Sequence, residues 1–286
     1  MVSRTSIRRG LQVLGIRGLA IAGSQKLLWR GSAPALGIRE IVTGARVLEV
    51  GGPSEIFRPH GLVALYGMPD SIDNVNFANE TIWEHGLADG GDYAPEGERL
   101  GTQYLREATD LKIRGSYDVV ASSHTIEHTA NPLRALAEYR KVTRPGGHLI
   151  LVVPHLDGTV DHRRPITSLE HLIEDERNNT PESDATHWRE AIELSDPARM
   201  DGMTVEEWSN RIYDNINRRS CHHHVFSTWS ALEMVRQGGW SPVSASAFWP
   251  YDIVVIASND TRVQDVKVRS PFPTDRKRRP SDRRRV

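Results

Sequence analysis

The chain contains a single cysteine, Cys221, so no disulfide can form within it. Nothing in the sequence therefore requires an oxidising compartment, and we expect a cytoplasmic location. The chain also lacks a long apolar run. The stretch LQVLGIRGLAIAG (11–23) is interrupted by Arg17, is too short to span a membrane and has no small-residue cleavage pattern. These absences argue against a disulfide-stabilised, membrane-spanning or exported protein.

The composition is that of a soluble globular enzyme, with 286 residues, 38% hydrophobic and 26% charged. The net charge of -1 conceals two basic ends. Residues 1–35 carry six Lys/Arg and no Asp/Glu, and we expect a basic helical segment that packs on the domain or lies on a membrane surface. Residues 262–286 carry ten basic and three acidic residues, and we expect a flexible tail able to contact acidic partners.

Residues 36–261 contain no internal repeat and are expected to form one domain. RVLEV (46–50) runs directly into GGPS, and YDVVASS (117–123) is a second buried-strand pattern. Asn131 before Pro132 is typical of a helix start, and RPGG precedes the apolar run HLILVVP. The order strand, helix, turn, strand predicts an α/β sheet of mostly parallel strands.

A long segment with little strand character, residues 155–225, interrupts this pattern. It is too long for a simple loop, so we expect a helical insertion after the fifth strand. The segment FSTWSALEMVRQGGW then predicts a helix, and SPVSASAFWPYDIVVIASN predicts a closing strand pair.

The segments VLEVGGPS, EATDL (107–111) and YDVVASSHTIEHTANPLRALAEYRKVTRPGGHLILVVPH (117–155) together resemble the class I S-adenosylmethionine-dependent methyltransferases. DHRRP and HHHVF resemble a subgroup that we associate with bacterial glycan and secondary-metabolite pathways. The resemblance implies a Rossmann-like sheet of seven strands, with one antiparallel strand inserted by the final hairpin. It also implies S-adenosylmethionine bound across the carboxyl ends of the strands.

The resemblance implies roles for particular residues in holding this cofactor. The glycine turn would approach its methionine and ribose parts, an acidic residue at the end of the second strand would bind the ribose hydroxyls, and EATDL would bind the adenine. Asp73 is the expected ribose ligand, with Asp70 as the alternative. Pro53 stands where dinucleotide-binding turns have their second glycine, which argues against a dinucleotide. The full expected set is Glu49, Gly51, Gly52, Asp73, Asp110, Leu111, Ser123 and His124.

Methylation of a hydroxyl requires a base, and histidine is the side chain best suited to accept a proton near neutral pH. His155 and His162 follow the fifth strand and are the leading candidates, with His128 as a third. Around the acceptor we expect Arg163 and Arg164, which clamp an anionic group or pair with acids of the insertion. His222, His223 and His224 are expected at the mouth of the cleft.

We therefore expect O-methylation of a sugar or natural product. A nucleic-acid methyltransferase is the alternative, although residues 155–225 hold fifteen acidic and only eight basic residues, a poor lining for phosphates. A non-catalytic, S-adenosylmethionine-binding regulatory protein also stays open. No recognised metal-ligand spacing occurs, and a divalent cation would have only weak candidate ligands in His222, His224 and His187.

Overall fold

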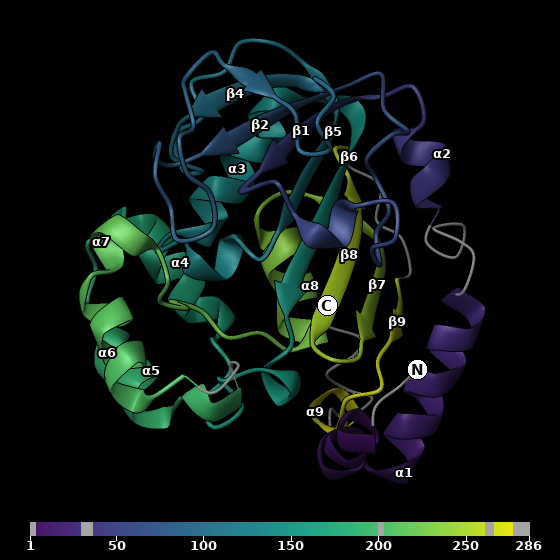
Figure 1. Ribbon diagram of the computed structural model, residues 1–286, viewed down its shortest axis with the longest axis vertical. Helices are drawn as coiled ribbons and strands as arrows, with labels where there is room; N and C mark the ends of the chain where they lie inside the picture. Colours follow the sequence, from purple (N-terminus) through teal and green to yellow (C-terminus); the bar gives the residue numbers. More distant parts are fainter. Residues whose placement is uncertain (1–3, 30–36, 200–202, 261–265, 277–286) are drawn as a thin grey trace.

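The computed structural model describes residues 4–29, 37–199, 203–260 and 266–276, and its centre is one twisted sheet (Figure 1). The strand order is β3-β4-β2-β1-β5-β6-β8-β7-β9. The bounds are β1 Arg46–Val50, β2 Ser71–Asn76, β3 Asp92–Tyr93, β4 Gly101–Leu105, β5 Tyr117–Ser123, β6 Thr143–Pro154, β7 Ser241–Phe248, β8 Asp252–Ser258 and β9 Lys267–Arg269.

The expected α/β sheet is confirmed, but its strand number is nine among the described residues rather than seven. Strands β4, β2, β1, β5 and β6 are parallel, and β8 lies antiparallel between β6 and β7, as expected for the final hairpin. The two additional strands are the short edge strands β3 and β9. They are too short, at two and three residues, for an alternating apolar pattern to reveal them in the sequence.

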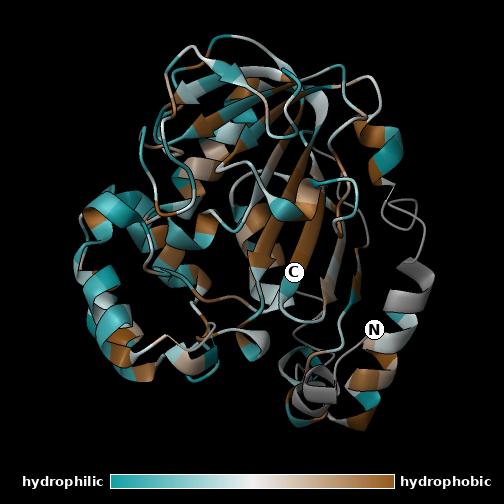
Figure 2. Cartoon of the chain, in the orientation of Figure 1, coloured by the Kyte–Doolittle hydropathy of each residue, from teal (hydrophilic) through white to brown (hydrophobic). Residues whose placement is uncertain are grey.

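Both faces of the sheet are buried, because successive side chains of a strand point to opposite sides. In β6, Leu149 and Leu151 belong to one hydrophobic core while Ile150 and Val152 belong to another. Helices α3 (Pro132–Val142) and α8 (Thr228–Gln237) cover the first face. The short helix α2 (Ile38–Val42) and the 3-10 turn η2 (Glu55–Phe57) cover the second. Figure 2 shows the hydrophobic residues concentrated in these central strands.

Residues 155–225 form the expected helical insertion, which lies beside the sheet (Figure 1). It contains α4 (Leu169–Asn178), α5 (Trp188–Leu194), α6 (Val205–Tyr213) and α7 (Asn215–Arg218), with η4 (Leu156–Gly158) and η5 (Pro197–Arg199). Its own small core surrounds the fully buried Trp208 and includes Val160, Ala191, Ile212 and Cys221. Cys221 thus acts as an apolar core residue.

The two basic ends meet in the structure. Helix α1 (Arg4–Trp29), kinked at Gly15, packs on the domain through the buried Leu14, and the Arg276 guanidinium donates to the Leu14 carbonyl at 2.9 Å. The expectation of a flexible tail is wrong for residues 266–276, which form β9 and α9 (Pro273–Arg276). Residues 277–286 lie outside the described part. In the described part of the chain, no helix is long and apolar enough to cross a membrane.

Candidate active site

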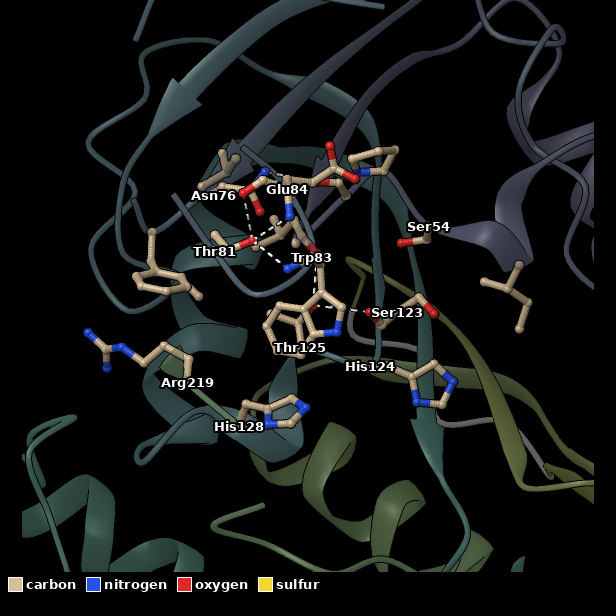
Figure 3. A pocket seen from close by; sticks show the side chains of 18 of the residues that line it. Ser54, Asn76, Thr81, Trp83, Glu84, Ser123, His124, Thr125, His128 and Arg219 are labelled. Atoms are coloured by element: carbon tan, nitrogen blue, oxygen red, sulfur yellow. Dashed lines mark hydrogen bonds between the residues drawn. The ribbon is translucent and has the colours of Figure 1, made fainter. Parts of the chain in front are cut away.

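A cavity of about 590 Å³ opens at the carboxyl ends of β1, β2, β4 and β5 (Figure 3). The strands deliver side chains there because parallel strands end at the same edge of a sheet. The turn after β1 contributes residues 51–54, and the loop after β4 contributes residues 106–108. The loop after β2 contributes Trp83, and Arg219 comes from the end of the insertion. The insertion therefore borders the cavity without filling it.

The two glycines of the turn after β1 line the cavity as expected. Gly51 has φ of +87°, and a Cβ there would lie 2.0 Å from Thr125 Oγ1. A Cβ at Gly52 would lie 2.2 Å from the carboxyl carbon of Glu49. The glycines are thus required for the packing of the turn against its own protein neighbours, in addition to any approach of a ligand.

Glu49 lies beneath this turn and does not line the cavity. It is fully buried and accepts hydrogen bonds from the Tyr93 hydroxyl at 2.7 Å, the Tyr66 hydroxyl at 2.9 Å and the Ser54 backbone N–H at 3.0 Å. Burial raises the pKa of Glu49, an effect that these hydrogen bonds oppose. Glu49 therefore stabilises the turn through its contacts with Gly52 and Ser54.

The structure places Asp73 away from the cavity. It lies in the middle of β2, opposite Leu48, and accepts hydrogen bonds from the Tyr117 hydroxyl and the Thr102 backbone N–H, each at 2.8 Å. The residue that ends β2 is Asn76, which lines the cavity and donates to the Gly52 carbonyl at 2.8 Å. Asp70 precedes β2 and so lies at the opposite edge. Asn76 lies three residues after Asp73, so a correct estimate of where the strand ends would have identified it.

The residues expected beside the adenine lie three positions after the ones that line the cavity. Asp110 pairs with Lys112 at 2.7 Å and Leu111 is fully buried in the core, and neither lines the cavity. Glu107 and Ala108, from the same EATDL segment, do line it. The EATDL segment thus reaches the cavity through Glu107 and Ala108 rather than through Asp110 and Leu111.

Ser123 and His124, at the end of β5, line the cavity together with His128 of the 3-10 turn η3 (Ile126–His128). The His124 ring lies 2.9 Å from Asp252 and 3.4 Å from Glu127. Burial opposes its charge, but these two carboxylates outweigh burial and raise the pKa of His124 to about 10. His124 is therefore protonated at neutral pH.

His128 has the opposite electrostatic character. Its Nδ1 lies 3.2 Å from the Cys221 carbonyl oxygen, and its ring makes an edge contact with Trp83 at 5.5 Å between centroids (Figure 3). Burial, and then the neighbouring His222, lower the pKa of His128 to about 4. His128 is thus neutral at pH 7, and because Nδ1–H donates to the carbonyl, the Nε2 atom carries the free electron pair.

The two leading base candidates lie outside the cavity. His155 is fully buried, stacks on Phe272 with ring centroids 4.0 Å apart, and lies 3.0 Å from Asp275 of α9. His162 borders a different hollow, of about 480 Å³, next to Arg199. Both follow β6, as expected, but neither lines the cavity.

The arginines of DHRRP pair with acids, the alternative that the sequence left open. Arg164 is buried and lies 2.9 Å from Asp161 and 2.9 Å from Glu190, and Arg163 pairs with Asp196 at 3.1 Å. Neither lines the cavity. Arg219, which the sequence analysis did not single out, does: it pairs with Glu107 at 2.7 Å and Glu182 at 2.8 Å. Glu107 lies 112 residues before Arg219 in the sequence, so no local spacing indicates their contact.

The three consecutive histidines point to different surroundings and stay outside the cavity lining. His222 contacts Asp161 at 2.5 Å and the His128 ring at 4.6 Å between centroids. His223 lies 3.1 Å from Asn215, and the His224 ring lies 5.7 Å from that of His187. The three histidines were expected at the mouth of the cleft, but only His222 comes near the cavity, through its contact with the lining residue His128.

Residues 90–151, from β3 into β6, match a family model described as a methyltransferase domain. The matched residues include parts of the parallel sheet at strands β4, β5 and β6. Residues 90–151 of the chain are thus similar to a methyltransferase domain. This match covers the loop after β4 and the segment from β5 to β6, which contribute lining residues 106–108, 123–125, 128 and 129.

Two curated relatives match parts of this chain. An uncharacterized 37.1 kDa protein in transposon TN4556 of Streptomyces fradiae is 43% identical over 49 residues, 17% of this chain and 14% of that protein. The lovastatin diketide synthase lovF of Aspergillus terreus is 29% identical over 153 residues, 51% of this chain and 5% of that protein. The chain thus spans a small fraction of the length of either relative.

Solved structures of similar fold include an S-adenosylmethionine-dependent methyltransferase from Aquifex aeolicus, with 15% identity, a TM-score of 0.43 and coverage of 84% of this chain and 96% of that one. Another, from Mesorhizobium loti, has 14% identity, a TM-score of 0.46 and coverage of 80% and 99%. Structural similarity with TM-scores this low supports no conclusion about the function of this chain.

Proposed function

We propose that the chain is an S-adenosylmethionine-dependent methyltransferase that methylates a hydroxyl of a small acceptor, a sugar or natural product, with His128 as the general base. The observation that carries this proposal is the cavity at the carboxyl edge of a methyltransferase sheet, with a neutral histidine in its wall. The family match supports the reaction class.

The residues present fit this cofactor. A cavity of about 590 Å³ falls within the range of about 300–1,000 Å³ usual for small-molecule sites. The turn at residues 51–54 and Asn76 would hold the ribose and methionine parts, and Glu107 with Ala108 would border the adenine. When bound, S-adenosylmethionine supplies an electrophilic methyl group on a sulfonium.

Of the two histidines that follow β5 in the cavity wall, His128 is the better-placed base. His124 is already protonated and cannot accept a proton, whereas the Nε2 of His128 is free to do so. As the acceptor oxygen gains its bond to carbon, its proton passes to His128 Nε2. The carboxylate of the buried Glu127, with Oε1 3.9 Å from that nitrogen, stabilises the resulting imidazolium.

The cofactor site can be tested by calorimetry with S-adenosylhomocysteine. Ala108→Trp places a large ring into the cavity wall, and we expect it to weaken binding by more than about 100-fold, which is about 2.7 kcal/mol. Ala94→Trp is the matched control, because Ala94 is exposed and away from the cavity. Equal affinity in both variants would show that the ligand binds elsewhere.

The base can be tested by comparing His128→Gln with His155→Gln. We expect His128→Gln to lower kcat by about 100- to 10,000-fold while S-adenosylhomocysteine affinity is unchanged. His155→Gln should instead lower the free energy of unfolding by about 1–3 kcal/mol, because it disrupts the buried contact with Asp275. We expect its kcat to stay close to that of wild type. Turnover retained in His128→Gln and lost in His155→Gln would reverse the assignment.

Acceptor screening separates this proposal from its alternatives. Release of S-adenosylhomocysteine with hydroxylated small molecules supports it. Tight cofactor binding with no turnover on any acceptor would favour a regulatory protein, and turnover on RNA or DNA alone would favour a nucleic-acid methyltransferase.

A further inference from the structure

Three histidines meet inside the insertion, well separated in sequence. His171 belongs to α4, His187 is the residue before α5, and His224 lies in the segment that returns to the sheet. One ring nitrogen from each falls within 4.8 Å of the others, and the Nε2 atoms of His171 and His187 are 2.9 Å apart. None of the three lines the 590 Å³ cavity.

The ring nitrogens of this group, here called the three-histidine cluster, are available as ligands. Nε2–H of His224 donates to the Ala130 carbonyl at 3.3 Å, which leaves Nδ1 with a free electron pair. That Nδ1 atom is buried and has no hydrogen-bond partner among the described residues. A metal-binding histidine commonly donates its second ring N–H to a carbonyl in this way.

A carboxylate lies beside the cluster. Asp175, one turn after His171 on α4, places Oδ2 3.4 Å from His171 Nε2 and 3.8 Å from His224 Nε2. This oxygen is buried and, within the described ranges, accepts no hydrogen bond. Buried carboxylate oxygens are normally hydrogen-bonded or bound to a cation, so its environment favours an additional positive charge.

We propose that the three-histidine cluster binds a divalent transition-metal ion of the zinc class. Around a tetrahedral zinc with bonds of about 2.0–2.1 Å, neighbouring ligand atoms lie about 3.3 Å apart. In the cluster, one pair of nitrogens is 2.9 Å apart and every pair lies within 4.8 Å, so small movements would bring the three atoms to that spacing. Neutral imidazoles suit Zn²⁺, Co²⁺ and Ni²⁺, and Asp175 stands next to the fourth position.

The ion would crosslink the helices of the insertion to the segment that leads back to the sheet. It would join α4, the start of α5 and the return segment that leads into α8. Because a metal site of this kind is assembled only in the folded chain, its binding free energy adds to the stability of the segments that it joins. The inference does not depend on the proposed methyl transfer.

A second group, Glu127, His128 and His222, also brings its ligand atoms within 4.8 Å. His222 contacts Asp161, and His128 is the proposed base in the cavity wall. The experiment must therefore locate any bound ion at one group or the other.

The test uses the full-length protein after dialysis against a chelator, titrated with ZnCl₂ by calorimetry and with CoCl₂ by visible absorption. We compare wild type with His187→Gln and with His171→Asn; both positions are part-exposed, so these variants should fold. His85→Gln is the control, because His85 is exposed and lies outside both groups. Circular dichroism before the titration checks that each variant is folded.

We expect one Zn²⁺ per chain, a higher Tm with the metal, and Co²⁺ bands typical of tetrahedral nitrogen ligation. His187→Gln and His171→Asn should each weaken Zn²⁺ binding by more than about 100-fold, because the loss even of a partner outside the ligands costs about 10- to 100-fold. His85→Gln should bind as wild type. Absence of saturable binding in wild type, or unchanged binding in both cluster variants, would overturn the proposal.

Discussion

The histidines at the sheet edge and those of the insertion are the same residue type in two different settings. At the edge, two carboxylates keep the His124 ring charged, whereas burial and the neighbouring His222 keep the His128 ring neutral. In the insertion, His171, His187 and His224 face mainly one another. Because burial acts to lower the pKa of both edge histidines, the difference in their charged neighbours decides which ring holds a proton.

The two settings are physically linked by a buried ion-pair group. Arg164 donates to the His222 carbonyl at 2.8 Å and pairs with Asp161, which in turn contacts the His222 ring. His222 then contacts the His128 ring. A change in this group should reveal whether the insertion can loosen while the cavity keeps its shape.

The largest effect is expected from Arg164→Ala. Without the Arg164 side chain, the buried Asp161 has no arginine partner. Removal of one partner of a buried ion pair lowers the free energy of unfolding by about 3–5 kcal/mol. We expect hydrogen exchange to rise throughout residues 155–225, while S-adenosylhomocysteine affinity changes little. Arg163→Ala is the matched control, since its half-exposed pair with Asp196 should contribute less than about 1 kcal/mol. Equal destabilisation by both changes would contradict this account.

The parts of the fold that follow from local pattern could be predicted from the sequence. Strand β6 carries seven consecutive buried or half-buried residues after RPGG, and α3 begins with Asn131 accepting from the Arg134 N–H. Such signals are contained within a dozen residues. The edge strands β3 and β9 are stabilised by pairing with distant neighbours, so their own sequences carried no such signal.

The sequence predicted the lining residues that directly follow a strand. It did not predict those whose side chains reach the cavity from segments distant in the sequence. The glycine turn after β1 and the pair Ser123 and His124 follow directly from strand ends. His155 was misplaced because the sequence cannot show that the chain bends toward α9 at that point. Arg219 reaches the cavity only through its contacts with Glu107 and Glu182, on separate segments.

The pH dependence of turnover sharpens the contrast between His124 and His128. A general base works only when it is deprotonated, so kcat/KM should fall as the pH drops through the pKa of His128. That pKa is lowered to about 4, compared with about 6.5 for an unperturbed histidine, so kcat/KM should be flat between about pH 6 and 8. A limb centred near pH 6.5 in wild type that disappears in His128→Gln would contradict the pKa direction.

The smallest expected effects come from two helix caps, one on each side of the comparison. Ser227 caps α8 against the sheet and Thr204 caps α6 in the insertion, and both form capping boxes. Replacing either by Ala should cost about 1 kcal/mol. If the insertion opens as a separate unit, Thr204→Ala should speed amide exchange only within the insertion, whereas Ser227→Ala should lower the global free energy of unfolding. Identical exchange patterns in the two variants would instead mean that the sheet and the insertion unfold together, because a weakened cap then lowers one shared free energy.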